Sequence, residues 1–264
     1  MSGISLDIDT RTMIPFDTLF TRNVPHIIEK IFFSLDYESY KACLEVSDAW
    51  NELLSTESYK KRAKLVYKHE IYRDEMELIS KAYYGRAGAI KKLISSGLVD
   101  VNCVDERGWT PLHQAAYSSY TILAQILLDG GADPNMESKS GQTPLNVAWW
   151  GCKATVKLLL ERGANPNCQD SDGMTPLHKS WNTDSVQLLL DGGADPNQKN
   201  SFGMTPLHRA ARAGREDIVK ILLNGGALPD RVNDEGDSPY YLAANATTGI
   251  PGRFWLTTNR WSTS

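Results

Sequence analysis

The chain has 264 residues, of which 28 are Lys or Arg, 32 are Asp or Glu and 41% are apolar. This composition is typical of a globular protein and excludes a wholly disordered or collagen-like chain. No apolar run approaches the roughly 18 residues of a membrane helix, and the net charge is −4, so we expect neither a membrane nor nucleic acid as a partner. The four cysteines fit no disulfide framework or zinc spacing, which predicts an intracellular protein, cytoplasmic or alternatively nuclear.

Residues 1–20 show no pattern of helix or strand and are predicted to be a flexible segment. Residues 21–65 differ, because apolar side chains recur at helical spacing over 27–35 and again over 40–54. Asp36 separates the two runs. This spacing predicts a small unit built from short helices.

The order of residues in this unit resembles the F-box, which in that family is a three-helix module. Residues 24–36 read VPHIIEKIFFSLD and residues 43–54 read CLEVSDAWNELL, with the F-box spacings from proline to leucine and from leucine to tryptophan. Two departures are present: valine replaces the usual leucine before the proline, and the common glutamate at the fourth position is missing. A generic helical cap on the rest of the chain is the alternative interpretation.

F-box modules dock on the Skp adaptor of a cullin ubiquitin ligase, so the resemblance implies a Skp-type adaptor and, through it, a cullin as partners. A unit of about 45 residues is marginally stable alone, which makes completion by an adaptor surface physically reasonable. The positions that the resemblance assigns to the adaptor are Pro25, Ile28, Ile31, Leu35, Leu44, Val46 and Trp50.

The stretch over 58–76 contains neither glycine nor proline and is predicted to be helical. Its last part, residues 66–76, would join the F-box-like unit to the following segment as a rigid linker. A rigid arm suits a receptor, because it sets the distance between a ligase and its bound target.

From residue 103 onward one phrase, Thr-Pro-Leu-His, recurs along the chain, with Asn146 in place of the histidine in its second copy. Its prolines are Pro111, Pro144, Pro176, Pro206 and, in a decayed copy, Pro239, a period of 30 to 33 residues. A second phrase, Gly-Ala-Asp-Pro-Asn and its variants, recurs in step with the first. Proline is favoured at the first position of a helix and threonine before it as a cap, so each copy predicts a helix start.

Two phrases that share one period of about 33 residues resemble the ankyrin repeat. That family stacks pairs of helices joined by hairpin fingers. The resemblance implies an ankyrin array over 77–246, with repeats at about 75–102, 103–135, 136–167, 168–197, 198–230 and a truncated copy at 231–246. Residues 247–264 are predicted to be a loose tail, because glycine and proline interrupt the sequence where another helix is expected.

The predicted fold class is therefore all-α: a short N-terminal three-helix F-box followed by an ankyrin-repeat solenoid with β-hairpin fingers. Two repeats are shorter than their neighbours. The distance from Pro111 to Gly131 is 20 residues, whereas Pro144 to Gly163 is 19 and Pro176 to Gly193 is 17. The missing residues fall where the two helices join, which predicts that a helix in each of these repeats is shorter by about a turn.

No motif of a known catalytic site is present in the sequence, and its His and Cys residues lack metal-ligand spacing. His113, His178 and His208 all belong to the recurring phrase, where the resemblance implies an internal hydrogen-bonding role. We therefore expect a protein that is not an enzyme and that requires no metal or other cofactor.

The first helices and the fingers are the elements with which an ankyrin array would bind a target. Candidate residues lie at the base of a finger or on the exposed side of a first helix, and many are of the types enriched in binding hot spots. They are Trp109, Gln114, Tyr117, Gln142, Trp150, Met174, Phe202, Met204, Arg209 and Arg212. We expect Trp109 and Tyr117 to be exposed, whereas Trp150 and Trp181 could instead fill the gaps left by the shortened repeats.

Together these features predict a non-catalytic substrate-recognition subunit of a cullin-type E3 ubiquitin ligase, a monomer within its complex, whose repeats hold an unidentified target protein. The sequence leaves two alternatives open. One is an ankyrin scaffold or inhibitor with no ligase role, and the other is a pathogen effector that mimics a host F-box protein.

Overall fold

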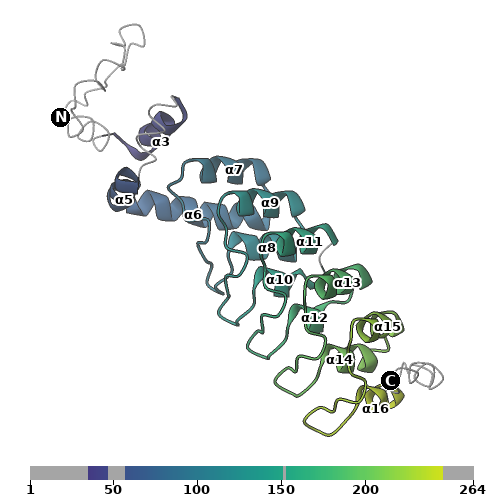
Figure 1. Cartoon of the computed structure of the whole chain (residues 1–264). Helices are drawn as coiled ribbons and strands as arrows, with labels where there is room; N and C mark the ends of the chain where they lie inside the picture. The colour runs from purple at the N-terminus through teal and green to yellow at the C-terminus, as the bar shows by residue number, and fades with distance from the viewer. Residues whose placement is uncertain (1–34, 47–56, 151–152, 246–264) are drawn as a thin grey trace, which may run out of the picture. The chain divides into compact units, whose positions relative to one another are not determined.

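The computed structural model describes residues 35–46, 57–150 and 153–245 (Figure 1). The chain divides into two compact units, Met1–Glu70 and Ile71–Ser264. Every regular element in the described residues is a helix, as predicted for the all-α class, and none of these helices is long and apolar enough to cross a membrane.

The first unit contains α3 (Tyr37–Val46) and α5 (Glu57–Val66). Asp36, predicted to separate two apolar runs, caps the start of α3. Its carboxylate accepts the N–H of Ser39 at 2.8 Å, and hydrogen bonding to Ser39 lowers the pKa of this carboxyl. The position that breaks the sequence pattern is therefore also the position that begins the helix.

A small aromatic core connects α3 to Tyr67, the residue after α5. The ring of Tyr67 lies 5.3 Å from the ring of Tyr37 and 5.2 Å from that of Tyr40, and all three side chains are buried. The Tyr67 hydroxyl donates a hydrogen bond to the Leu35 carbonyl at 3.1 Å. The stretch predicted to be helical is divided at Tyr67, because α6 (Lys68–Tyr83) begins directly after it.

Most of the predicted adaptor contacts lie outside the described residues. Pro25, Ile28, Ile31 and Trp50 are among them, and for Leu44 and Val46 only the backbone, within α3, is described. Leu35 is half-buried just before α3. The segment 1–20 and the tail 247–264 also lie outside, so the F-box, the flexible segment and the loose tail stay predictions.

The second unit is a stack of helix pairs. The pairs are α6 with α7 (Ala87–Ser95), α8 (Pro111–Tyr117) with α9 (Thr121–Asp129), α10 (Pro144–Val147) with α11 (Lys153–Glu161), α12 (Pro176–Lys179) with α13 (Thr183–Asp191), and α14 (Pro206–Arg212) with α15 (Glu216–Asn224), followed by α16 (Pro239–Asn245). Figure 1 shows α8, α10, α12, α14 and α16 in one row, which we call the inner helices, and α9, α11, α13 and α15 in a second row. The finger loops extend from the side of the inner helices.

The recurring phrase starts each inner helix as predicted. In α8, Pro111 is the first helical residue and the Oγ1 of Thr110 accepts the N–H of His113 at 3.3 Å. Leu112 is fully buried in the core that runs through the array, and burying one such side chain contributes about 2 kcal/mol. The same caps begin α10 and α12. In α14, Pro206 is again the first helical residue, and the N–H of Thr205 donates to the Nδ1 of His208 at 3.1 Å.

The histidine of the phrase joins each repeat to the next. The Nε2 of His113 lies 2.8 Å from the carbonyl of Gln142 in the following finger. A carbonyl only accepts hydrogen bonds, so Nε2 carries the proton and Nδ1 accepts the N–H of Thr110 at 3.1 Å. His178 and His208 make the equivalent contacts to Met204 and Asp237. The predicted internal role of these histidines is confirmed.

In the third repeat Asn146 makes the hydrogen bonds that histidine makes in the other copies of the phrase. Its Oδ1 accepts the N–H of Thr143 at 3.1 Å, and its Nδ2 donates to the Met174 carbonyl at 3.1 Å. An asparagine side chain therefore reproduces the acceptor and donor of a neutral histidine ring. The substitution leaves the connection between these two repeats intact.

The asparagine of the second phrase forms another connection. Asn135 accepts the N–H of Asn165 at 2.8 Å and donates to the Gly163 carbonyl at 2.9 Å, both in the next repeat. Asn167 and Asn197 repeat this pair of hydrogen bonds one and two repeats further along. The three junctions between the second and fifth repeats are thus joined by hydrogen bonds from both recurring phrases.

The β-hairpin strands expected in the fingers are not present in the part of the chain that the structure describes. Each finger is instead a turn closed by two backbone hydrogen bonds, such as those from Asp105 N–H to the Trp109 carbonyl at 3.0 Å and from Gly108 N–H to the Asp105 carbonyl at 2.9 Å. Single bonds also join adjacent fingers, for example from Lys139 N–H to the Arg107 carbonyl at 3.0 Å. These isolated turn bonds do not make a strand ladder.

The shortened repeats have shortened inner helices, as predicted. α10 and α12 have 4 residues each, whereas α8 and α14 have 7. The chain after α10 forms a short 3-10 helix, Ala148–Trp150, and the chain after α12 turns extended at Ser180. The deletion therefore removes about one turn from the inner row and leaves α11 and α13 at full length.

The buried histidines make the stability of the array depend on pH. Burial lowers the pKa of His178 to about 4, so between about pH 6.5 and that value the unfolded chain binds a proton that the folded chain does not. The free energy of unfolding is expected to decrease as the pH is lowered through this window, by up to about 1.4 kcal/mol per pH unit for one histidine. His178→Asn, which copies Asn146, should remove this contribution and keep the hydrogen bonds.

Urea unfolding of the natural chain and of His178→Asn at about pH 7 and about pH 5 measures the effect. The natural chain is expected to lose more stability on acidification than the variant. An equal loss in both proteins would contradict the role of His178.

Candidate protein-binding surface

The predicted target contacts lie on the inner helices and at the bases of the fingers, but they differ in exposure. Phe202 is 62% exposed and Tyr117 is 45% exposed, and Arg212 is also exposed. Half-buried candidates are Trp109, Gln142, Met174 and Arg209. The side chain of Trp150 lies outside the described part of the structure.

Two candidates offer little surface to a partner. Met204 is 7% exposed and Gln114 is 9% exposed. The amide of Gln114 donates a hydrogen bond to the hydroxyl of Ser118 at 2.9 Å, at the end of its own helix.

Trp109 is half-buried rather than exposed. The ring of Tyr117 meets it edge-on with 5.5 Å between ring centres, and the guanidinium of Arg107 lies 4.5 Å from its ring centre. Trp109 also packs against the core of the array. Of the two aromatic residues expected to be exposed, Tyr117 is the one that is available to a partner.

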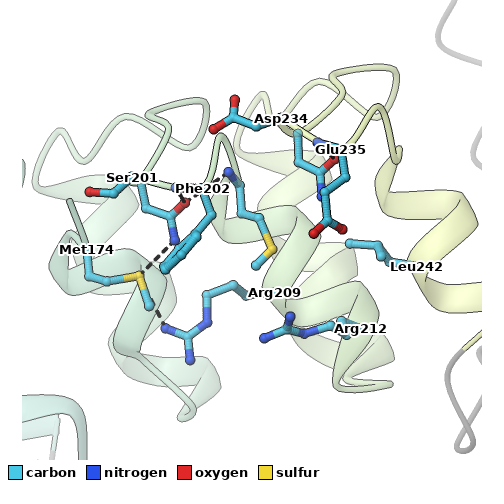
Figure 2. Close-up of a pocket in the computed structure, with 11 residues that line it drawn as sticks. Met174, Ser201, Phe202, Arg209, Arg212, Asp234, Glu235 and Leu242 are labelled. Carbon is cyan, nitrogen blue, oxygen red and sulfur yellow. Dashed lines mark hydrogen bonds between the residues drawn. The ribbon is translucent and has the colours of Figure 1, made fainter. Parts of the chain in front are cut away.

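A hollow of about 430 Å³ opens beside the fourth, fifth and sixth repeats, and we call it the Arg209 hollow (Figure 2). Five of the ten candidates line it together: Met174, Phe202, Met204, Arg209 and Arg212. In Figure 2 the two arginine side chains extend from α14 below Phe202, while Asp234 lies at the top of the view. The fold thus gathers residues from separate repeats around one concave surface.

A second hollow of about 220 Å³ shares Arg209 and is lined also by Gln142, Trp149, Lys179 and Trp181. The guanidinium of Arg209 lies 5.8 Å from the ring centre of Trp181. Trp149 and Trp181 were not among the candidates, because they replace small core alanines of the repeat. The shortening of α10 and α12 is the signal that could have identified them, since each tryptophan lies two residues after the end of a shortened α-helix.

A third hollow, of about 290 Å³, lies at the first two repeats of the array. Tyr83, Tyr84, Arg107 and Trp109 contribute to it, and the two tyrosines are 60% and 67% exposed. These tyrosines are not among the candidates predicted from the sequence, because the first repeat lacks the recurring phrase that marks equivalent positions in the other repeats. Three hollows with aromatic side chains therefore line the inner helices and fingers.

One ion pair on this surface is nearly buried. The Nζ of Lys179 lies 2.5 Å from the Oδ2 of Asp170, and the two side chains are 16% and 4% exposed. The Oδ1 of Asp170 also accepts the N–H groups of Asp172 and Met174, which shape the finger turn. The carboxylate of Asp170 therefore serves both the turn and the ion pair.

The described residues contain no group of three or more His, Cys, Asp or Glu side chains arranged to hold a metal ion. Burial raises the pKa of the Cys103 thiol to about 12, so this side chain is a thiol and not a reactive thiolate. Burial also lowers the pKa of His113 and of His208, whose ring nitrogens are both engaged within the array.

The fold and the surface define a helical repeat array with aromatic hollows on one side. A family model described as ankyrin repeats in three copies matches residues 78–170, 155–231 and 177–250. These matches cover more than half of the chain, which therefore belongs to the ankyrin-repeat family and carries an ankyrin-repeat protein–protein interaction domain.

Curated relatives match within parts of the chain. The mouse (Mus musculus) 2-5A-dependent ribonuclease is 33% identical over 78 residues, which are 30% of this chain and 11% of that protein. Oxysterol-binding protein-related protein 1 of Rattus norvegicus is 42% identical over 72 residues, 27% of this chain and 8% of that protein. An ankyrin repeat-containing protein of Schizosaccharomyces pombe is 36% identical over 63 residues, 24% of this chain and 30% of that protein. The chain thus spans less than a third of the length of each of these relatives.

The ion pair between Asp170 and Lys179 is expected to stabilise the fourth repeat. Asp170→Asn should keep the turn, because Asn200 makes the same turn in the next finger, but it leaves Lys179 without its counter-ion in a nearly buried position. We expect a loss of about 3 kcal/mol in the free energy of unfolding, measured in urea.

Asp172→Asn is the matched control, because Asp172 is exposed and two residues away. It should change the stability by less than about 0.5 kcal/mol. Similar stabilities for the two variants would show that the pair contributes little.

Proposed function

We propose that the chain is a non-catalytic substrate-recognition subunit of a cullin-type E3 ubiquitin ligase. Residues 77–246 bind the target protein, residues 21–65 dock a Skp-type adaptor, and residues 66–76 join the two. Segments 1–20 and 247–264 flank these parts. The protein acts in the cytoplasm or nucleus as a monomer within the ligase complex.

The observation that carries target binding is the set of three hollows along the inner helices and fingers. Phe202, Tyr83 and Tyr84 are each at least 60% exposed beside these hollows. Large aromatic side chains and arginine dominate the energetics of protein interfaces, and a folded array presents them at little entropic cost. A concave surface of this kind supports binding of a protein segment.

The adaptor half of the proposal rests on the F-box-like order of residues 24–54. The described part of the first unit is compatible with it. Tyr37, Tyr40 and Tyr67 supply the buried core of that part, and none of the three is among the seven positions assigned to the adaptor. The proposal therefore does not require one side chain to serve both the core and the interface.

The alternatives differ in what the first unit does. In an ankyrin scaffold or inhibitor it is a helical cap and binds no adaptor, whereas an effector that mimics a host F-box protein binds the adaptor of the host. Copurification of a Skp-type adaptor with the full chain separates the scaffold from the other two.

The adaptor test compares the natural chain with the double variant Leu35→Ala and Trp50→Ala. Truncating large apolar groups in a buried contact costs about 2–5 kcal/mol each, so adaptor recovery in a pull-down is expected to fall at least about tenfold. The array variant Tyr117→Ala is the control and should retain the adaptor. Circular dichroism verifies that all three proteins are folded.

Full adaptor recovery by the folded double variant would refute the assignment of these two residues. No recovery by the natural chain would refute the ligase role and leave the scaffold as the function. Binding by the array is tested separately below.

A further inference from the structure

Each finger turn contains one residue at an equivalent position of its repeat. It is occupied by Asp105, Ser138, Asp170, Asn200 and Asn233. In each case the side-chain oxygen accepts the backbone N–H groups two and four residues later. Aspartate, serine and asparagine all make the turn, so the turn itself does not require a charge.

The second position is the third residue after the helix-starting proline, which is Lys179 in α12 and Arg209 in α14. Lys179 has a counter-ion in Asp170 of its own repeat at 2.5 Å. The corresponding residue in the next repeat is Asn200, which has no charge to offer. Among the described residues Arg209 forms no ion pair, although the same scaffold surrounds it.

The donors around Arg209 face a weak acceptor. The Nη1 of Arg209 lies 3.5 Å from the sulfur of Met174, and the Nδ2 of Asn200 lies 3.2 Å from the same sulfur (Figure 2). A thioether accepts hydrogen bonds poorly. Asn200 is 6% exposed, so its amide is held in this orientation by the fold. Arg209 and Asn200 could therefore donate to a stronger acceptor, such as an oxygen atom of a bound partner.

Two cations lie close together on one side of the hollow. Arg212 lies one helical turn after Arg209, and burial together with this second cation lowers the pKa of Arg209. A partly buried cation without a counter-ion is costly and is stabilised by an incoming anion. The carboxylate of Asp170 also acts electrostatically on Arg209, but Lys179 and the finger turn already engage this carboxylate.

Asp234 and Glu235 also line the hollow. Their negative charges disfavour a doubly charged phosphate more strongly than a singly charged carboxylate. The exposed ring of Phe202 and the side chain of Met174 provide apolar surface next to the arginines. The surroundings therefore favour a carboxylate that has an apolar neighbour.

We propose that the Arg209 hollow binds an aspartate or glutamate side chain of the target protein, with an adjacent apolar side chain of the target against Phe202 and Met174. Arg209 and Asn200 donate the hydrogen bonds to the carboxylate, in place of the contact with sulfur. This inference rests on target binding by the array and is independent of the ligase role.

Three random heptapeptide libraries, with glutamate, glutamine or phosphoserine at the central position, provide the probes. Binding to the immobilised full chain is measured at physiological salt. The natural chain is expected to retain the glutamate library at least about tenfold better than the glutamine library, the gain of a charge-assisted hydrogen-bonded pair.

Two variants take their residues from other repeats of this chain. Asn200→Asp copies Asp170 and supplies Arg209 with an internal counter-ion, so it should abolish the preference for glutamate while the melting temperature stays equal or rises. Arg209→Gln copies Gln114 and should abolish the preference as well. Lys91→Gln removes one positive charge from α7, outside the inner helices, and should leave the preference unchanged.

Equal retention of the glutamate and glutamine libraries by the natural chain would overturn the proposal, as would a persistent preference in folded Asn200→Asp. A stronger preference for phosphoserine would also overturn it, in favour of a phosphorylated target. Equal retention of all three libraries would overturn the preference for a carboxylate but would still support binding of peptide segments by the array. No retention of any library would overturn this inference and contradict binding of peptide segments by the array, whatever the adaptor test shows.

Discussion

The hydrogen bond from each buried side chain of the recurring phrase to the next finger is the interaction on which the rest of the array depends. One helix pair cannot bury its own apolar face, so stability comes from the interfaces between repeats. The Nε2 of His113 reaches the Gln142 carbonyl, 29 residues away in sequence, and Asn146 makes the equivalent contact where histidine is missing. These bonds couple the start of an inner helix to the base of the neighbouring finger, and so they set where each finger stands relative to the helices.

The surface available to a partner follows from this stacking and from where it is interrupted. The loss of one turn from α10 and α12 occurs in the inner row, while α11 and α13 keep their length. Trp149 and Trp181, which replace small residues, follow these shortened helices and line a hollow. Arg209 lies between this hollow and its larger neighbour. The two repeats with shortened helices thus contribute large aromatic side chains to the surface where small residues are expected.

The same scaffold also allows neighbouring repeats to differ in charge. Aspartate and asparagine are interchangeable in the finger turn, because both offer an oxygen to the backbone N–H groups. They are not interchangeable for the cation beside the turn, since only aspartate provides a counter-ion. Lys179 is therefore satisfied within the protein, whereas Arg209 is directed toward a methionine sulfur. A substitution in the finger turn that preserves the fold can in this way change the ligand that the neighbouring surface binds.

The sequence by itself determined the period, the helix starts at Thr and Pro, the internal role of the histidines and the shortened helices, because each depends on residues close together in the chain. The tertiary structure alone decided which candidates are accessible. Gln114 and Met204 are buried and Trp109 is half-buried, because exposure depends on tertiary packing that sequence spacing does not specify. In the described residues the fingers lack the expected strands, because their few backbone hydrogen bonds form turns and not a ladder. That Arg209 has no ion pair among the described residues likewise emerged only from the structure, since ion pairing depends on distances between side chains that sequence spacing does not specify.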